Sequence, residues 1–235
     1  MIFPNVSSPI LPFALLGVLL AFSLLFIFLG RFGYQKENEE TYRFRSMFPF
    51  EIFPRDNVKA GNAIKGVYLL ASIASLGIAY YFVSSFFLSP RGIFVLGLFA
   101  SILLLGKSVS LGFLLILPAY YHKAHNVLDA LSFSLSALST FVSGYYLFKV
   151  NGVLHGVSFV LSIIAMAVGL LILFMMLSPR YKDWVKLDKR EDNGSVKVER
   201  PRFFLLAASE WAMYALTLLG DVFLYLSLGF LLFNI

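Results

Sequence analysis

Apolar residues fill six long stretches of the chain, and polar residues gather between them. The stretches run from Pro9 to Gly30, Gly66 to Leu88, Gly92 to Tyr120, Val127 to Phe148, Val157 to Leu177, and Phe203 to Phe233. A helix needs about 20 apolar residues to cross a hydrocarbon core about 30 Å thick. Each stretch is long enough, so we expect six transmembrane helices.

The apolar stretches are continuous, without the two-residue alternation of a membrane barrel strand. We therefore expect an all-α, multi-pass integral membrane protein with a single transmembrane domain over residues 1–235. The composition agrees, because 59% of the residues are hydrophobic and only 14% are charged, which is unusual for a soluble domain. The absence of cysteine excludes disulfides, thiolate metal ligands and a cysteine nucleophile.

Basic residues predict the orientation. Sixteen of the 19 lysines and arginines lie in the connecting segments 31–65 and 179–202 or at Lys123, whereas only Arg91 and Lys149 lie between the helices on the other side. The positive-inside rule places the richer segments in the cytoplasm and both termini outside. The first helix carries its positive charge after the apolar stretch, unlike a signal peptide, and is expected to be retained.

The net charge of +6 is explained by this topology. It predicts attraction to anionic lipid at the inner face of the bilayer, and not nucleic-acid binding. Without a targeting signal, the default expectation is a prokaryotic cytoplasmic membrane.

Two connecting segments have patterns of their own. The sequence YRFRSMFPFEIFPRD interleaves aromatic and basic residues, and is expected to rest at the lipid headgroup boundary or to dock a partner. The last segment alternates apolar and charged residues around the sequence Asp-Asn-Gly-Ser. This pattern predicts a small β-hairpin in which Val185 and Leu187 face Val196 and Val198.

Short sequences recur in the two halves of the chain. SLGFLL begins at Ser110 and again at Ser227, and KGVYLLASI at Lys65 resembles HGVSFVLSI at His155. Three helices in each half would make equivalent helices cross in opposite directions, as in transporters with a 3+3 inverted repeat. Chance similarity between Leu-, Phe-, Ser- and Gly-rich helices is the alternative.

Four ionisable residues lie inside the apolar stretches: Lys107, Asp129, Glu210 and Asp221. Lys107 and Asp221 each fall near the middle of a helix, where an unpaired charge is costly. We expect them to form an intramembrane charge pair. Such a pair either fixes how two helices pack or lines a path for a solute.

A polar stripe runs along the fourth predicted helix. Asp129, Ser132, Ser136, Ser139 and Ser143 recur at steps of three and four residues, which places them on one helical face. Small hydroxyl residues at this spacing favour close helix packing and interhelical hydrogen bonds. A polar lining is the second interpretation.

His122, His125 and Asp129 share one face at the start of the same helix, and Glu210 enters from the same side. Side chains of these types can hold a divalent metal ion. The alternative is a helix start with interfacial histidines, where polar and acidic residues satisfy the first backbone amides.

These features leave three functions open. The first is a small solute or ion transporter, or a channel-like protein, with a path near Lys107 and Asp221. The second is a non-catalytic membrane subunit or scaffold that works with partner subunits or as a homodimer. The third is a membrane enzyme acting on a lipid-linked substrate through His122, His125, Asp129 and Glu210. The chain has no Walker A, GxSxG or HExxH sequence, and no cofactor is expected.

Overall fold

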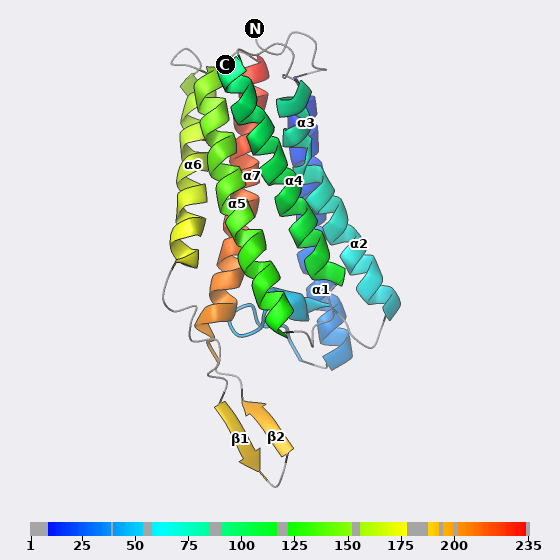
Figure 1. Cartoon of the computed structure of the whole chain (residues 1–235). Helices are drawn as coiled ribbons and strands as arrows, with labels where there is room; N and C mark the ends of the chain where they lie inside the picture. The colour runs from blue at the N-terminus through cyan, green and yellow to red at the C-terminus, as the bar shows by residue number, and fades with distance from the viewer. Residues whose placement is uncertain are drawn as a thin grey trace.

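The computed structural model describes residues 9–38, 40–53, 58–84, 91–116, 122–151, 156–177, 188–192, 195–199 and 202–233. These residues form a bundle of long helices with a short β-hairpin extending from one end (Figure 1). Six helical spans in this described part are long and apolar enough to cross a membrane. The prediction of an all-α fold with six such helices is therefore confirmed.

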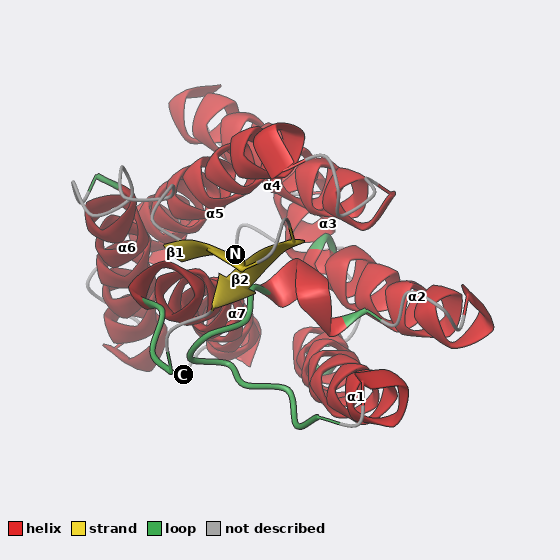
Figure 2. Ribbon diagram, turned by 90° about the horizontal axis from the view of Figure 1, so that it is seen from below, coloured by secondary structure: helices red, strands yellow, loops and turns green. Residues whose placement is uncertain are grey.

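Spans that follow one another in the sequence run in opposite directions (Figure 1). They are α1 (Leu11–Asn38), α2 (Val58–Ser75) with α3 (Gly77–Ser84), α4 (Arg91–Ile116), α5 (His122–Asn151), α6 (Gly156–Met176) and α7 (Leu205–Phe233). Viewed from the hairpin end, α1 and α2 lie on one side and α5 and α6 on the other, with α4 and α7 between them (Figure 2). In this arrangement α7 packs against α1, α5 and α6.

The helices at the hairpin end are longer than predicted. α1 continues past Gly30 to Asn38, and α2 already begins at Val58 instead of Gly66. The predicted segment 31–65 is therefore too long. The prediction ended each helix with its apolar stretch, but arginine, glutamine, lysine and glutamate are good helix formers, and they extend α1 beyond that stretch.

The second span is interrupted, although the sequence predicted one continuous helix. The amide of Leu76 donates to the carbonyl of Ile73, 3.0 Å away, which makes a tight turn between α2 and α3. The Tyr225 hydroxyl donates to the carbonyl of Ala74 beside this turn. A Cβ atom on Gly77 would lie 2.5 Å from the Tyr225 hydroxyl oxygen and 2.7 Å from a Leu15 methyl group. Glycine at this position therefore lets α7 and α1 approach the turn.

The aromatic segment 40–53 folds into the hairpin end of the bundle. It contains a 3₁₀-helix, η1 (Pro49–Ile52), and it buries Tyr42, Met47, Phe48 and Ile52. The Tyr42 hydroxyl donates to the carbonyl of Phe48 (2.6 Å), and the indole N–H of Trp211 in α7 lies 3.1 Å from the same hydroxyl oxygen. These side chains pack against the apolar surface of α1, α2 and α7. The prediction that the segment lies at the level of the lipid headgroups stays a prediction.

The predicted hairpin is present, with a different register. β1 (Asp188–Asp192) pairs antiparallel with β2 (Ser195–Glu199), so that Val196 lies opposite Glu191 and Val198 opposite Lys189. Val185 and Leu187 lie outside the described residues. The register differs from the prediction because only two residues separate the strands, and pairing therefore starts at Asp192 and Ser195.

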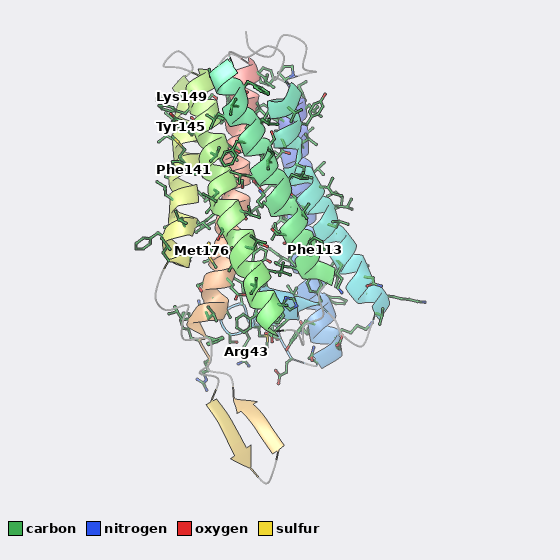
Figure 3. The ribbon with its side chains drawn as sticks, in the orientation of Figure 1. Arg43, Phe113, Phe141, Tyr145, Lys149 and Met176 are labelled. Carbon is green, nitrogen blue, oxygen red and sulfur yellow. The ribbon has the colours of Figure 1, made fainter. Side chains whose placement is uncertain are left out.

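The first and the last helix place the two ends of the chain on one side of the bundle. α1 begins and α7 ends at the end opposite the hairpin (Figure 1). Arg43 lies at the hairpin end, whereas Lys149 lies at the other end (Figure 3). Both chain ends therefore approach the same side of the bundle, and the side of a membrane that each end faces stays a prediction.

Candidate functional site

Lys107 and Asp221 meet in the interior of the bundle. Lys107 lies in α4 and Asp221 in α7, the two helices that face each other between the flanking pairs (Figure 2). The lysine Nζ is 2.7 Å from one carboxylate oxygen and 2.9 Å from the other. Lys107 is 1% exposed and Asp221 is 3% exposed. Lys107 and Asp221, which are 114 residues apart in the sequence, thus form a buried ion pair in which Nζ contacts both carboxylate oxygens.

Serines of α2 and α4 form a hydrogen-bonded group near this pair. The Ser75 hydroxyl donates to the carbonyl of Ser72 (2.7 Å), and its oxygen lies 3.2 Å from the Ser108 hydroxyl oxygen. Ser108 directly follows Lys107, so this contact fixes the lysine-bearing turn of α4 against α2. The sequence analysis missed these serines, although the i, i+3 spacing of Ser72 and Ser75 was a usable signal.

A cavity of about 180 Å³ adjoins the ion pair. It is lined by α1, α2, α4 and α7, with Lys107 and Asp221 among the lining residues. The polar residues of the lining also include Ser72, Ser75 and Thr217, and its aromatic residues are Phe26, Tyr68, Trp211 and Tyr214. The Thr217 hydroxyl oxygen is buried and has no hydrogen-bond partner among the described residues. The cavity has room for several water molecules or a small solute.

The polar stripe of α5 is buried but does not line this cavity. Asp129, Ser132, Ser136, Ser139 and Ser143 are all at most 6% exposed, and no α5 residue is among the described residues that line the cavity. Close helix contacts occur along α5, since a Cβ on Gly220 of α7 would lie 2.7 Å from Thr140, and one on Gly169 of α6 would lie 2.8 Å from the Ala137 carbonyl oxygen. These contacts involve Thr140 and Ala137, whereas the hydroxyl oxygens of Ser132, Ser136 and Ser143 have no hydrogen-bond partner among the described residues. Packing and a polar lining therefore both stay open for the stripe.

The four predicted metal ligands are only partly brought together. Asp129 and Glu210 are both buried on the facing helices α5 and α7. The His125 ring stacks on Phe50, with ring centroids 4.8 Å apart. The side chain of His122 lies outside the part of the chain that can be described. Among the described side chains, no three His, Asp or Glu residues form a group that could hold a metal ion, and the four-ligand site stays a prediction.

A second serine contact joins α6 to α7. The Ser158 hydroxyl donates to the carbonyl of Ser227 (2.6 Å), and the Ser227 hydroxyl donates to the carbonyl of Ser158 (2.9 Å). Reciprocal bonds of this kind hold apolar helices together where lipid offers no hydrogen-bond partners. Ser227 belongs to the repeated SLGFLL sequence, whose role as a packing contact was not evident from sequence.

No protein family, curated protein or solved structure matches this chain. The fold is compatible with a multi-pass membrane protein, because its six long helices are apolar enough to span a bilayer. Function must be inferred from the interior of the bundle.

Proposed function

We propose that the protein is an integral protein of the cytoplasmic membrane that moves a small solute or ion along a path beside the Lys107–Asp221 pair. One observation supports this most directly: both charged side chains line a partly open cavity between α1, α2, α4 and α7, although they are themselves almost completely buried. Intramembrane charges are costly and commonly mark solute or ion pathways. A pair used only for packing does not require an adjoining space.

The lining is mostly apolar with a few polar groups, which supports a small solute that carries one charged or polar group. Lys107 can donate to an anionic group, Asp221 can accept from a cationic group, and Thr217 offers an unpaired hydroxyl. The volume of about 180 Å³ lies below the range of about 300–1,000 Å³ that is usual for drug-sized ligands. A solute that contacts either charge weakens the attraction between the two, which gives α4 and α7 a reason to move relative to each other.

Topology and assembly form part of this proposal. The hairpin end faces the cytoplasm, where its basic residues contact anionic lipid. α4 and α7 run in opposite directions (Figure 1), which agrees with a 3+3 inverted repeat and with Lys107 and Asp221 in corresponding places. A homodimer or partner subunits would complete the assembly.

The scaffold and enzyme hypotheses make different demands on the same residues. In a non-catalytic subunit, the ion pair only fixes how α4 packs on α7, and the cavity stays dry. In an enzyme acting at the cytoplasmic face, His125, Asp129 and Glu210 carry the activity and Lys107 does not contact the substrate. Access of water to the cavity therefore separates transport from the scaffold hypothesis.

Cysteine labelling tests whether water reaches the cavity. The natural chain has no cysteine, so Thr217→Cys introduces the only reactive thiol. We expect this thiol to react with a small hydrophilic thiosulfonate reagent in native membranes, because only the water-accessible thiolate reacts readily. The fraction modified is measured by mass spectrometry.

Ser158→Cys is the matched control, because it also replaces a buried hydroxyl but lies between α6 and α7, away from the cavity. We expect it to react at least tenfold more slowly. Equal protection of both thiols would contradict a water-accessible path and favour the scaffold hypothesis. Protection of Thr217→Cys by one member of a panel of small anions and cations would identify the solute class.

A further inference from the structure

Asp129 and Glu210 form a second buried polar site, separate from the Lys107–Asp221 pair. Asp129 is 6% exposed and Glu210 is 1% exposed. Both carboxylate oxygens of Glu210 and the Oδ2 atom of Asp129 have no hydrogen-bond partner among the described residues. The hydroxyl oxygen of Ser132, one turn from Asp129 on α5, is likewise buried and without such a partner.

The register of α5 and α7 places the two acids at the same level. Both helices run from the hairpin end to the opposite end (Figure 1). One turn beyond the acids, the rings of Phe133 and Tyr214 are in contact, with centroids 5.1 Å apart. Two turns further, Thr140 closely approaches Gly220. Phe133 and Tyr214 are 81 residues apart in the sequence, and Thr140 and Gly220 are 80 apart. Asp129 and Glu210 are also 81 residues apart, and parallel helices have the same rise per residue, so Asp129 lies beside Glu210.

Among the described residues, the surroundings of the two acids hold a further carboxylate, phenol groups and the imidazole of His125. Glu51 of η1 and Asp129 are both within electrostatic range of Glu210. The other titratable groups nearby come from each neighbouring element: Tyr42 from the loop before η1, Tyr68 from α2, His125 from α5 and Tyr214 from α7. Neither Asp129 nor Glu210 forms a salt bridge with a lysine or arginine among the described residues.

Two adjacent carboxylates without a counter-charge are very costly to bury as anions. From this geometry we propose that Asp129 and Glu210 bind one small monovalent cation, a proton or a sodium ion. Either cation neutralises half of the buried charge and bridges the two acids. Sodium accepts oxygen ligands such as carboxylates and the Ser132 hydroxyl. A calcium site normally supplies six to eight oxygen ligands, whereas the two carboxylates and one hydroxyl provide at most five.

The site is tested on the full chain in detergent or lipid nanodiscs by thermal unfolding at pH 7. Sodium chloride is exchanged for choline chloride at constant ionic strength. If the cation is sodium, we expect a concentration tenfold above its Kd to raise Tm by about 3–6 °C. Glu210→Gln and Asp129→Asn each remove one negative charge with little change in shape, and should abolish this sodium dependence. Glu40→Gln, which neutralises an exposed carboxylate, should retain it.

If the cation is a proton, Tm is independent of sodium, and infrared spectra of the natural protein show the carbonyl stretch of a protonated carboxylic acid. That band should be missing in Glu210→Gln or Asp129→Asn and present in Glu40→Gln. A natural protein with neither sodium dependence nor this band overturns the proposal, and this test does not require either variant to fold. An inaccessible Thr217→Cys thiol would leave the cation site unaffected, so the two proposals fail separately.

Discussion

At the scale of single residues, the mostly apolar interior of the described bundle holds four buried charged side chains, Lys107, Asp129, Glu210 and Asp221. Lys107 and Asp221 satisfy each other through two short contacts, whereas Asp129 and Glu210 have no such opposite partner among the described residues. For a buried ion pair, removing one member and replacing both members have different effects on stability. Breaking a buried pair leaves one uncompensated charge, but replacing both members by apolar residues removes the desolvation cost as well.

Single substitutions of the ion pair should therefore destabilise the protein more than the double substitution does. We expect Lys107→Met or Asp221→Leu alone to lower the free energy of unfolding by about 3–5 kcal/mol, because the remaining charge stays buried. The double variant should regain most of this loss. Chemical unfolding in detergent, followed by circular dichroism, measures the difference. A double variant as unstable as the sum of the single ones would show that the two charges do not act as a pair.

The residue scale also shows how far the sequence could predict the site. Lys107 and Asp221 could be matched because few charges interrupt the apolar stretches, and opposite charges at equal depth attract each other. The cavity beside them could not be predicted, because its lining comes from four helices whose rotations depend on packing. Serine spacing on α5 identified a face but not its neighbour. Ser72, Ser75 and Ser108 were missed because their contact depends on how α2 packs against α4.

At the scale of elements, apolar length predicted the helices well and their ends poorly. The break at Leu76 depends on contacts with Leu15 and Tyr225, which no local pattern in α2 reveals. The segment 40–53 has the composition of an interfacial peptide, yet it folds onto the bundle because Trp211 and its neighbours present matching aromatic surfaces. Rings of Phe44 and Trp211, for example, meet edge to face at 4.8 Å.

Tyr42 should make this segment sensitive to alkaline pH. Burial raises the pKa of the Tyr42 phenol well above its ordinary value; the hydrogen bond from Trp211 opposes the rise, and the charges of Glu51 and Glu210 add to it. Since the folded-state pKa is raised, the stabilisation is fully present below the unfolded-state pKa of about 10 and is lost as the pH rises above it. We expect the segment to detach from α7 in this range.

Fluorescence of Trp211, in a Trp184→Phe background, reports the detachment of the segment. Tyr42→Phe loses the bond to the Phe48 carbonyl and should lower the free energy of unfolding by about 1–2 kcal/mol at pH 7, while removing the transition above pH 10. Tyr80→Phe, at a 56% exposed position, is the control and should keep both. An unchanged alkaline transition in Tyr42→Phe would assign it to another tyrosine.

At the scale of the whole molecule, the uneven distribution of basic residues matches the shape of the bundle. The segments rich in lysine and arginine, including the hairpin, lie at one end, and α1 begins and α7 ends at the other (Figures 1 and 3). The number of spans and their up-and-down order could be predicted because a bilayer restricts each crossing to one helix length. In the proposed inverted repeat, the second span of the first half (α2 with α3) corresponds to α6 in the second half. These two spans differ, because the former is broken at Leu76 and α6 is continuous.

The orientation follows from this charge asymmetry and can be measured directly. Because the natural chain lacks cysteine, Ile10→Cys and Ser195→Cys each provide a single thiol at opposite ends of the bundle. The positive-inside rule places Ser195 in the cytoplasm. We therefore expect a membrane-impermeant maleimide to label Ile10→Cys on intact cells, and to label Ser195→Cys only after the membrane is permeabilised. A permeant maleimide should label both and controls for expression. The opposite pattern would contradict the proposed topology and would place the Asp129–Glu210 end of the bundle at the outer face, where it would sample the external concentrations of sodium and protons.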